Sequence, residues 1–402
     1  MRSYKMGTSK RKAIFTLLCV LIHAFLLTGC WDRQELNEIN IIMGVAEDFD
    51  ESAKEITIVG IDPSQKQAGK EGSKGTSDYS IYSAQGKNLF DAEKNLALLT
   101  PRLEYWSHCD LILVSKEQAE KEGVRDILSF FSRDYSRRLT ATLIVTEGRA
   151  DEMFLSAPSE SKNPAQKILD IQRFVGKSGK GIHKSIYEFM AETEAVTGVG
   201  LASYYTIQDF GGDPIISGRG KEKLAQGTAV FKDYKLIGIF TPEETQGVNW
   251  LRGEILPGFA ITFPAQKNGP VDASFVTDSV KTKIEPFLTA TGSFVKVGIA
   301  VSGKINEYAG EENLMDEKVF KDIEQACSEQ IKWDILRSWK KCQQEFQVDA
   351  YRLGDKFSNK YKTVLELSQQ EWQEIFLDMK LELDIKVAIR GSGLRREGPK
   401  RG

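Results

Sequence analysis

The sequence predicts an α+β protein, a mixed α/β chain of three domains in which each domain is a sheet packed by helices. Two observations support this class. From Ile39 onwards, short apolar runs alternate with amphipathic segments. The chain has 402 residues, 41% hydrophobic and 28% charged, which is the composition of a folded protein longer than one domain of about 150 residues.

In the N-terminal half, an acidic turn joins predicted strands at residues 39–46 and 56–61. A stretch rich in Gly, Ser, Lys and Gln at residues 63–77 has no apolar face, so we expect an exposed loop there. The other elements predicted from apolar spacing are a strand at 79–84, a helix at 89–99, a strand at 111–114, a helix at 124–131, a strand at 139–145, a helix starting near 164, a helix at 185–195 and a strand at 199–207.

The main domain boundary is predicted at residues 208–223. Four glycines and Pro214 in this stretch indicate a linker or an exposed hairpin. Residues 30–207 then form an N-terminal mixed α/β region, with room for a further division near 148–165. Residues 224–391 form a C-terminal mixed α/β domain with a long helix, and residues 392–402 form a basic tail.

The C-terminal half begins with a predicted hairpin, in which strands at 227–231 and 236–240 flank a polar turn. Thr241 before Pro242 and two acids indicates a helix start. The remaining predicted elements are strands at 259–263, 273–284 and 294–305, a long helix with apolar or cysteine positions from Val319 to Phe346, and a final edge or one-faced strand at 381–387.

Residues 1–29 are predicted to be a lipoprotein signal peptide. Five basic residues precede an apolar run at 13–27, and Thr28 and Gly29 form a small-residue exit. The 15 residues of the run are fewer than the roughly 20 that a spanning helix needs. We therefore expect export to the extracytoplasmic face and exclude a polytopic channel or transporter.

Cys30 is the candidate lipid-attachment residue. The sequence Leu27-Thr28-Gly29-Cys30 resembles the bacterial lipobox, in which the thiol receives a diacylglyceryl group before cleavage between the last two residues. The expected mature protein begins at Cys30, carries a covalent diacylglyceryl and N-acyl lipid there, and has no other cofactor. The alternatives are an uncleaved anchor and a plain secretory signal.

The net charge argues against nucleic acid as a partner. The chain has 54 basic and 57 acidic residues, a net charge of −3. Without the five basic residues of the signal segment, 49 basic residues face 57 acidic ones, a net charge of −8. A body this acidic is repelled by phosphate backbones.

The cysteine pattern predicts no disulfide. Cys19 leaves with the signal peptide and Cys30 carries the lipid. Cys327 and Cys342 fall in one predicted helix, where 15 positions correspond to about 22 Å of rise, too far for a disulfide. Cys109 stands beside an apolar run and is expected to be a small buried side chain.

No pattern for a catalytic or metal site is found. His108 and His183 lack the spacing of metal ligands, and no G-x-S-x-G motif occurs. Residues 176–178 read Gly-Lys-Ser like the end of a phosphate-binding loop, but Ile171 stands where that loop needs glycine. The basic loop that follows, at 179–184, is expected to be solvated, and contact with a membrane surface is the alternative.

The start of the mature chain carries a family resemblance. Cys30-Trp31-Asp32-Arg33, followed by Glu35-Leu36, resembles the Ger(x)C family, the lipoprotein C subunits of the nutrient-germinant receptors of spore-forming bacteria. Other segments occur in the family's order: residues 86–92, 108–114, 133–138, 227–232, 235–238 and 349–386. At 115–116, Ser-Lys replaces the Gly-Glu expected from the family.

The resemblance implies a protein tethered to the outer face of the spore inner membrane. It would act there with two integral membrane partners, the A and B subunits, so that a dormant spore responds to nutrients. Family members look like three-domain mixed α/β proteins without enzymatic activity. Trp31, Asp32 and Arg33 are candidate interface or docking residues, although Trp31 packing on the first domain is an equal alternative.

Two other functions remain open at this point. A solute-binding lipoprotein that captures the nutrient itself would need a concave pocket with convergent polar groups. A wall-modifying enzyme would need a deep cleft with facing carboxylates.

Overall fold

The computed structural model describes residues 9, 12–13, 15–20, 35, 38–61, 79–100, 102–156, 163–209, 221–264, 272–290, 292–310, 314 and 316–391. These residues confirm the mixed helix-and-strand class. They form two sheets, one of nine strands and one of four, so the prediction of three domains is confirmed only in part. Within this described part, no helix is both long and apolar enough to cross a bilayer.

The first sheet has the strand order β3-β2-β1-β5-β6-β7-β8-β9, with β4 beside the start of β1. Strands β1, β5, β6 and β7 are parallel, and both flanks of the sheet are antiparallel. Its strands are β1 (Ile39–Asp48), β2 (Lys54–Ile61), β3 (Tyr79–Gly86), β4 (Leu103–Tyr105), β5 (Leu111–Ser115), β6 (Thr142–Thr146), β7 (Val199–Asp209), β8 (Lys221–Lys232) and β9 (Lys235–Phe240).

Helices cover both faces of this sheet, because parallel strands need crossover connections. Every residue of β5 and β6 is buried. Leu111 and Leu113 pack with Phe154 and Ile168 on one face, while Ile112 packs in a separate cluster on the other. The helices are α2 (Leu89–Leu96), α3 (Lys116–Lys121), α4 (Arg125–Ser132), α5 (Glu152–Leu155), α6 (Pro164–Val175) and α7 (Ile186–Glu194).

The first sheet continues across the predicted boundary at 208–223. Strands β7 and β8 lie on either side of that segment and pair antiparallel, from Val199 with Lys232 to Asp209 with Lys221. The sheet also continues across the predicted division near 148–165, because β6 and β7 are parallel neighbours. The chain therefore enters its second half while still building the first sheet.

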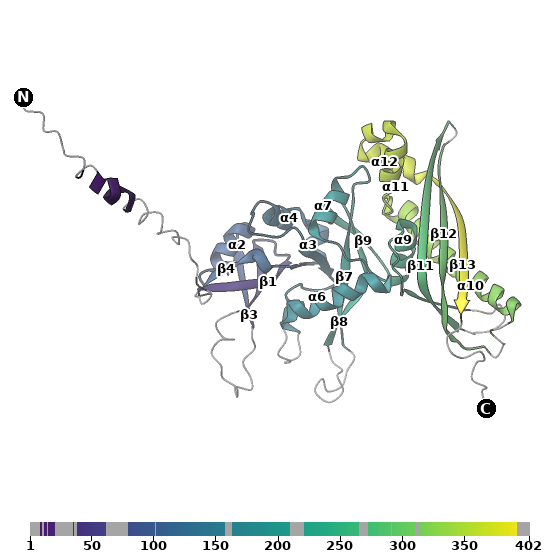
Figure 1. Cartoon of the computed structure of the whole chain (residues 1–402), viewed down its shortest axis with the longest axis horizontal. Helices are drawn as coiled ribbons and strands as arrows, with labels where there is room; N and C mark the ends of the chain where they lie inside the picture. The colour runs from purple at the N-terminus through teal and green to yellow at the C-terminus, as the bar shows by residue number, and fades with distance from the viewer. Residues whose placement is uncertain are drawn as a thin grey trace, which may run out of the picture.

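The second sheet has the order β10-β11-β12-β13 and stands at the opposite end of the molecule from β1, β3 and β4 (Figure 1). Its strands are β10 (Ala260–Pro264), β11 (Asp272–Thr289), β12 (Gly292–Tyr308) and β13 (Lys380–Gly391). The exposure of β13 alternates residue by residue, which confirms the prediction of a one-faced strand at the sheet edge. The accompanying helices are α9 (Pro242–Arg252), α10 (Glu317–Lys341), α11 (Leu353–Lys360) and α12 (Gln369–Leu377).

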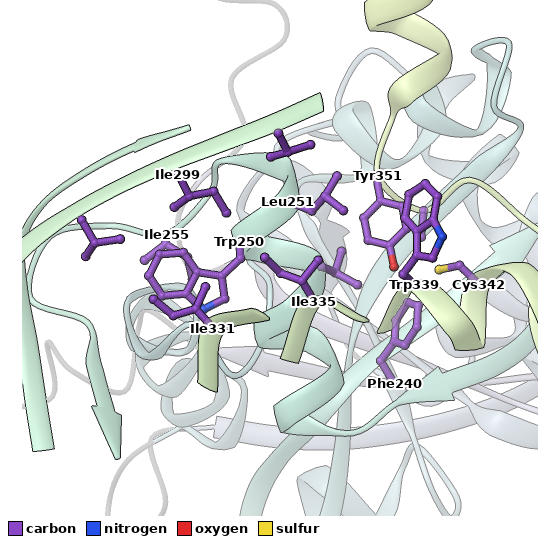
Figure 2. Packing of buried hydrophobic residues seen from close by; sticks show 14 of the residues in the cluster. Phe240, Trp250, Leu251, Ile255, Ile299, Ile331, Ile335, Trp339, Cys342 and Tyr351 are labelled. Atoms are coloured by element: carbon purple, nitrogen blue, oxygen red, sulfur yellow. The ribbon is translucent and has the colours of Figure 1, made fainter. Parts of the chain in front are cut away.

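The core of the second half is built on α10 (Figure 2). Ile323, Cys327, Ile331 and Ile335 are all buried, as their spacing of four predicts. Figure 2 shows Ile331 below the indole of Trp250 from α9, so α9 and α10 share one apolar core. The helix then widens into a short π-helical turn at Cys342–Phe346.

Candidate functional site

The predicted lipid-attachment and docking residues lie outside the described part of the structure. Gly29, Cys30, Trp31, Asp32 and Arg33 precede the first continuous described segment, which starts at residue 38. Their roles in cleavage, lipid attachment and docking therefore stay predictions. The predicted loop at 63–77 and the basic tail at 392–402 also lie outside the described residues.

The point where the chain enters the fold is well defined. The carbonyl oxygen of Glu38 accepts a hydrogen bond from the amide of Leu103 at 2.9 Å, and Ile39 pairs with Leu103 in parallel register. Strand β4 thus lies beside the start of β1. A tether at Cys30 would hold this end of the first sheet.

An acid with a strongly raised pKa lies at the carboxyl end of β1, an edge where α/β sheets often bind ligands. Glu47 is 1% exposed; its Oε1 accepts a hydrogen bond from Gln118 Nε2 at 3.3 Å and lies 3.9 Å from Lys54 Nζ. Burial raises the pKa of Glu47 to about 8, although Lys54 lowers it. Glu122 and Asp126 pair with the same lysine and raise the pKa of Glu47 further.

Asp48 is engaged on the other side of the strand. It accepts hydrogen bonds from the amides of Ala150 at 2.7 Å and Asp151 at 3.1 Å, and Arg149 Nη2 lies 3.7 Å away. Burial raises the pKa of Asp48 as well. Asp48 and Glu47 Oε1 are thus held by the chain's own donors, which favours a structural role in fixing α3 and α5 to the sheet, whereas Glu47 Oε2 is buried without a hydrogen-bond partner.

The side chains considered for chemistry show no metal-binding arrangement. His108 ends a 3₁₀ turn (Trp106–His108) and His183 lies before α7, where burial lowers its pKa. Among the described residues, no three His, Cys, Asp or Glu side chains are grouped to hold a metal ion.

The three cysteines expected in the mature body are free and fully buried. Cys109, Cys327 and Cys342 are each 0% exposed. Burial raises the pKa of all three thiols, so they are poor nucleophiles. Cys109 is the small buried side chain that its apolar neighbours predict.

The expectation that the basic loop at 179–184 is solvated holds for Lys180, which is exposed, but is wrong for Gly179, Gly181 and the Lys184 side chain, which are buried. The three residues before it form a 3₁₀ turn (Gly176–Ser178) at the end of α6, not a phosphate loop after a strand. The side-chain amide of Asn249 donates to the carbonyls of Gly179 at 2.9 Å and Gly181 at 3.2 Å. Gly179 also lies directly against Phe259, so residues of the second half hold this loop in place.

A buried ion network joins the two halves of the molecule. Glu192 of α7 is 2% exposed, and its Oε1 lies 2.6 Å from Arg252 Nη2 and 2.7 Å from Lys184 Nζ. Glu254 pairs with the same two cations at 3.1 and 3.2 Å, and Arg252 Nη1 donates to the Ala350 carbonyl at 3.1 Å. Sequence reasoning missed this network, because Glu192 and Arg252 are 60 positions apart and share no spacing motif.

An open groove of about 560 Å³ runs between α10 and the edge strand β13. Charged side chains dominate its walls: Lys321, Glu324, Glu329, Lys332, Asp384 and Lys386. Small-molecule sites usually enclose most of the ligand in a largely apolar cleft. The open, charged groove therefore does not favour the solute-binding alternative.

The fold and these contacts describe an α+β protein with two sheets. A buried ion network connects its N-terminal and C-terminal halves. Two family models match its two parts. Residues 32–204 match the spore germination protein N-terminal domain, and residues 226–393 match the spore germination B3/GerAC-like C-terminal domain. The segment between the two matches contains the predicted boundary at 208–223.

Individual relatives agree with both matches. The chain is 25% identical to spore germination protein KC of Bacillus subtilis (strain 168) over 96% of this chain and 97% of that protein. It is 22% identical to spore germination protein B3 of the same organism, over 91% and 95% of the two chains. The crystal structure of the GerBC protein shares the fold with a TM-score of 0.56 at 17% identity, covering 86% of this chain and 97% of that one. The chain belongs to the GerC family of spore germination proteins.

Proposed function

We propose that this protein is a non-catalytic, lipid-anchored subunit of a nutrient-germinant receptor in the spore inner membrane. It would work by binding two integral membrane partners, the A-type and B-type subunits. The observation that carries the proposal is the combination of both spore germination domains with a Cys-Trp-Asp-Arg start directly after a lipobox-like sequence.

The physical role of the lipid is to hold a body of net charge −8 against a bilayer that it would not enter by itself. Each buried methylene of an acyl chain contributes about 0.8 kcal/mol, and two or more chains give a durable anchor. The tether would restrict the body to the membrane surface. Its collisions with integral membrane partners would then be frequent even if each contact is weak.

The first experiment tests the complex. The protein is purified from detergent-solubilised spore membranes through a C-terminal affinity tag, and the bound proteins are identified by mass spectrometry. We expect A-type and B-type membrane subunits in the eluate. Recovery of the tagged protein without either subunit would contradict the proposal.

The second experiment tests the anchor. Cys30→Ala is expected to abolish metabolic labelling with a radioactive fatty acid and to leave an uncleaved or displaced precursor. Cys19→Ala is the matched control, because it removes a thiol from the same N-terminal segment and should leave labelling unchanged. Equal labelling of the two variants would exclude Cys30 as the attachment residue.

A further inference from the structure

A group of large apolar side chains is exposed at the α2–β4 end of the first sheet. Leu98, Leu99 and Leu103 are 83%, 54% and 56% exposed, Tyr105 is 38% exposed, and Tyr135 is fully exposed. We call these five residues the leucine patch. Single exposed apolar residues are normal on a protein surface, but several in one place mark an interaction site.

Chain proximity and one hydrogen bond place the residues of the leucine patch in one region. Leu98 and Leu99 directly follow α2, and the next described strand is β4, whose first and third residues, Leu103 and Tyr105, point to the same face. The loop that carries Tyr135 is fixed to this region, because Ser107 Oγ donates to the carbonyl of Ser136 at 2.8 Å.

The leucine patch stays exposed because other side chains fill the core beneath it. Leu89, Ala92 and Leu96 turn the apolar face of α2 towards the first sheet, and Trp106 fills the core directly after β4. The ion pair between Arg137 and Glu93, at 2.9 Å, ties the Tyr135 loop to α2. With these inner positions already filled, the patch residues have no place in the core of this chain.

The patch lies where a lipid tether would hold the molecule. The hydrogen bond between Glu38 and Leu103 joins β4 to the residue only eight positions after Cys30. A chain of eight residues spans at most about 28 Å when fully extended. Figure 1 shows β4 and α2 at the end of the molecule where β1 begins, far from β10–β13.

Positive charge accompanies the patch. In the loop at residues 133–138, Arg133 and Arg138 are exposed, whereas Arg137 is buried and pairs with Glu93 and Asp134. Lys94 is exposed on α2, and Glu104 is the acid between Leu103 and Tyr105. This local charge contrasts with the net charge of −8 of the whole body. Exposed arginines beside inserted apolar side chains suit a bilayer that contains anionic lipid headgroups.

We propose that the leucine patch is a membrane-contact face that seats the body on an anionic bilayer, with Leu98, Leu99 and Leu103 in the interfacial region. The two tyrosines would lie at headgroup level, and the exposed Arg133 and Arg138 would pair with lipid phosphates. The inference rests on the proposed lipid anchor at Cys30. It adds a fixed orientation, because a tether alone would leave the body free to rotate.

The test uses the mature lipidated protein in vesicles of phosphatidylcholine and phosphatidylglycerol. The thiols of Cys109, Cys327 and Cys342 are buried and the Cys30 sulfur would carry the lipid, so Leu98→Cys adds one accessible thiol for an environment-sensitive fluorophore. Leu336→Cys, 42% exposed on α10, is the matched control. We expect nitroxide-labelled lipids to quench the label at residue 98 about threefold more than the label at residue 336. In vesicles of phosphatidylcholine alone, quenching at residue 98 should fall about twofold.

The outcomes separate this inference from the anchor. Equal quenching at residues 98 and 336, with a lipid thioether found on Cys30 by mass spectrometry, would overturn the membrane-contact face and leave the anchor intact. Shielding of residue 98 in native spore membranes but not in pure lipid vesicles would mean that a membrane protein covers the patch, which also overturns the inference. A bare Cys30 would remove the anchor itself.

Discussion

The two sheets of this protein are stabilised in different ways. In the first sheet, β5 and β6 are buried on both faces between layers of helices. In the second sheet, β12 alternates buried and more exposed residues, and β13 contains no fully buried residue. The same kind of substitution should therefore lower the free energy of unfolding more in the first sheet than in the second. The junction between the two halves depends instead on buried charged side chains.

The largest effect is expected at the junction. Arg252→Ala should lower the free energy of unfolding by about 4 kcal/mol, because Glu192 would remain buried with fewer cations around it. Arg173→Ala is the control. Its pair with Asp170, at 3.1 Å, is solvent-exposed and should contribute at most about 0.5 kcal/mol. Urea unfolding followed by circular dichroism measures both, and similar losses would show that the junction network is not special.

The second prediction compares the sheets directly. Leu113→Ala on β5 should cost about 3 kcal/mol, because a fully buried side chain leaves a cavity between sheet and helices. Leu383→Ala on β13 should cost about 1 kcal/mol, because that side chain is only partly buried at the sheet edge. Equal losses in urea unfolding would remove the distinction between the two sheets.

The third prediction concerns pH. Glu47 has a pKa of about 8 in the folded protein against 4.5 as its ordinary value, so the folded state keeps a proton that the unfolded state releases. Wild-type stability should therefore fall as pH rises from 4.5 to about 8. Because Gln cannot ionise, the stability advantage of Glu47→Gln over wild type should grow by about 1.3 kcal/mol between pH 6 and pH 7.

Asp334 of α10 provides the control in the second half. Burial raises its pKa from 3.8 to about 6, so most of its pH-dependent loss is complete by pH 6. The advantage of Asp334→Asn should grow by only about 0.4 kcal/mol between pH 6 and pH 7. Parallel pH profiles for the two variants would contradict the difference between these sites.

The smallest effect is expected at helix caps, where the two halves should behave alike. Ser185 and Ser368 each cap a helix through a reciprocal capping box with a glutamate three residues later. Either Ser→Ala change should cost about 1 kcal/mol, because capping is a local interaction. Ser185→Asp keeps a side-chain acceptor and should restore most of the loss. Thermal unfolding measures all three; a much larger loss at one cap would show that tertiary contacts dominate there.

Most helices and strands could be predicted from apolar spacing, since periodicity depends on local geometry. The alternation at β13, the spacing of four in α10 and the cap at Thr241 are all found in the structure. Short elements such as β4 and α5 were missed, because three or four residues give no periodicity. The glycine-rich segment at 208–223 predicts a linker or an exposed hairpin at a domain boundary, and β7 and β8 on either side of it pair antiparallel in one sheet.

The candidate sites also differ in how well the sequence predicts them. The proposed lipid attachment at Cys30 is a linear motif, which an enzyme reads in an unfolded segment, so sequence alone can indicate it. Only a weak sequence pattern indicates the raised pKa of Glu47: its carboxylate directly follows the apolar residues Val45 and Ala46. No sequence pattern predicts the exposure of Leu98 and Leu103, because the residue type alone does not distinguish an exposed leucine from a buried one.

The sequence by itself determined the mixed class, the order of most elements, the family resemblance and the predicted tether, because each depends on residues that are close along the chain. Only the tertiary structure decided that one sheet crosses the predicted boundary, that Arg252 meets Glu192, and that the leucine patch gathers where the chain enters the fold. These features depend on strand pairing and burial between distant segments. A linear sequence does not record which distant side chains exclude water from one another.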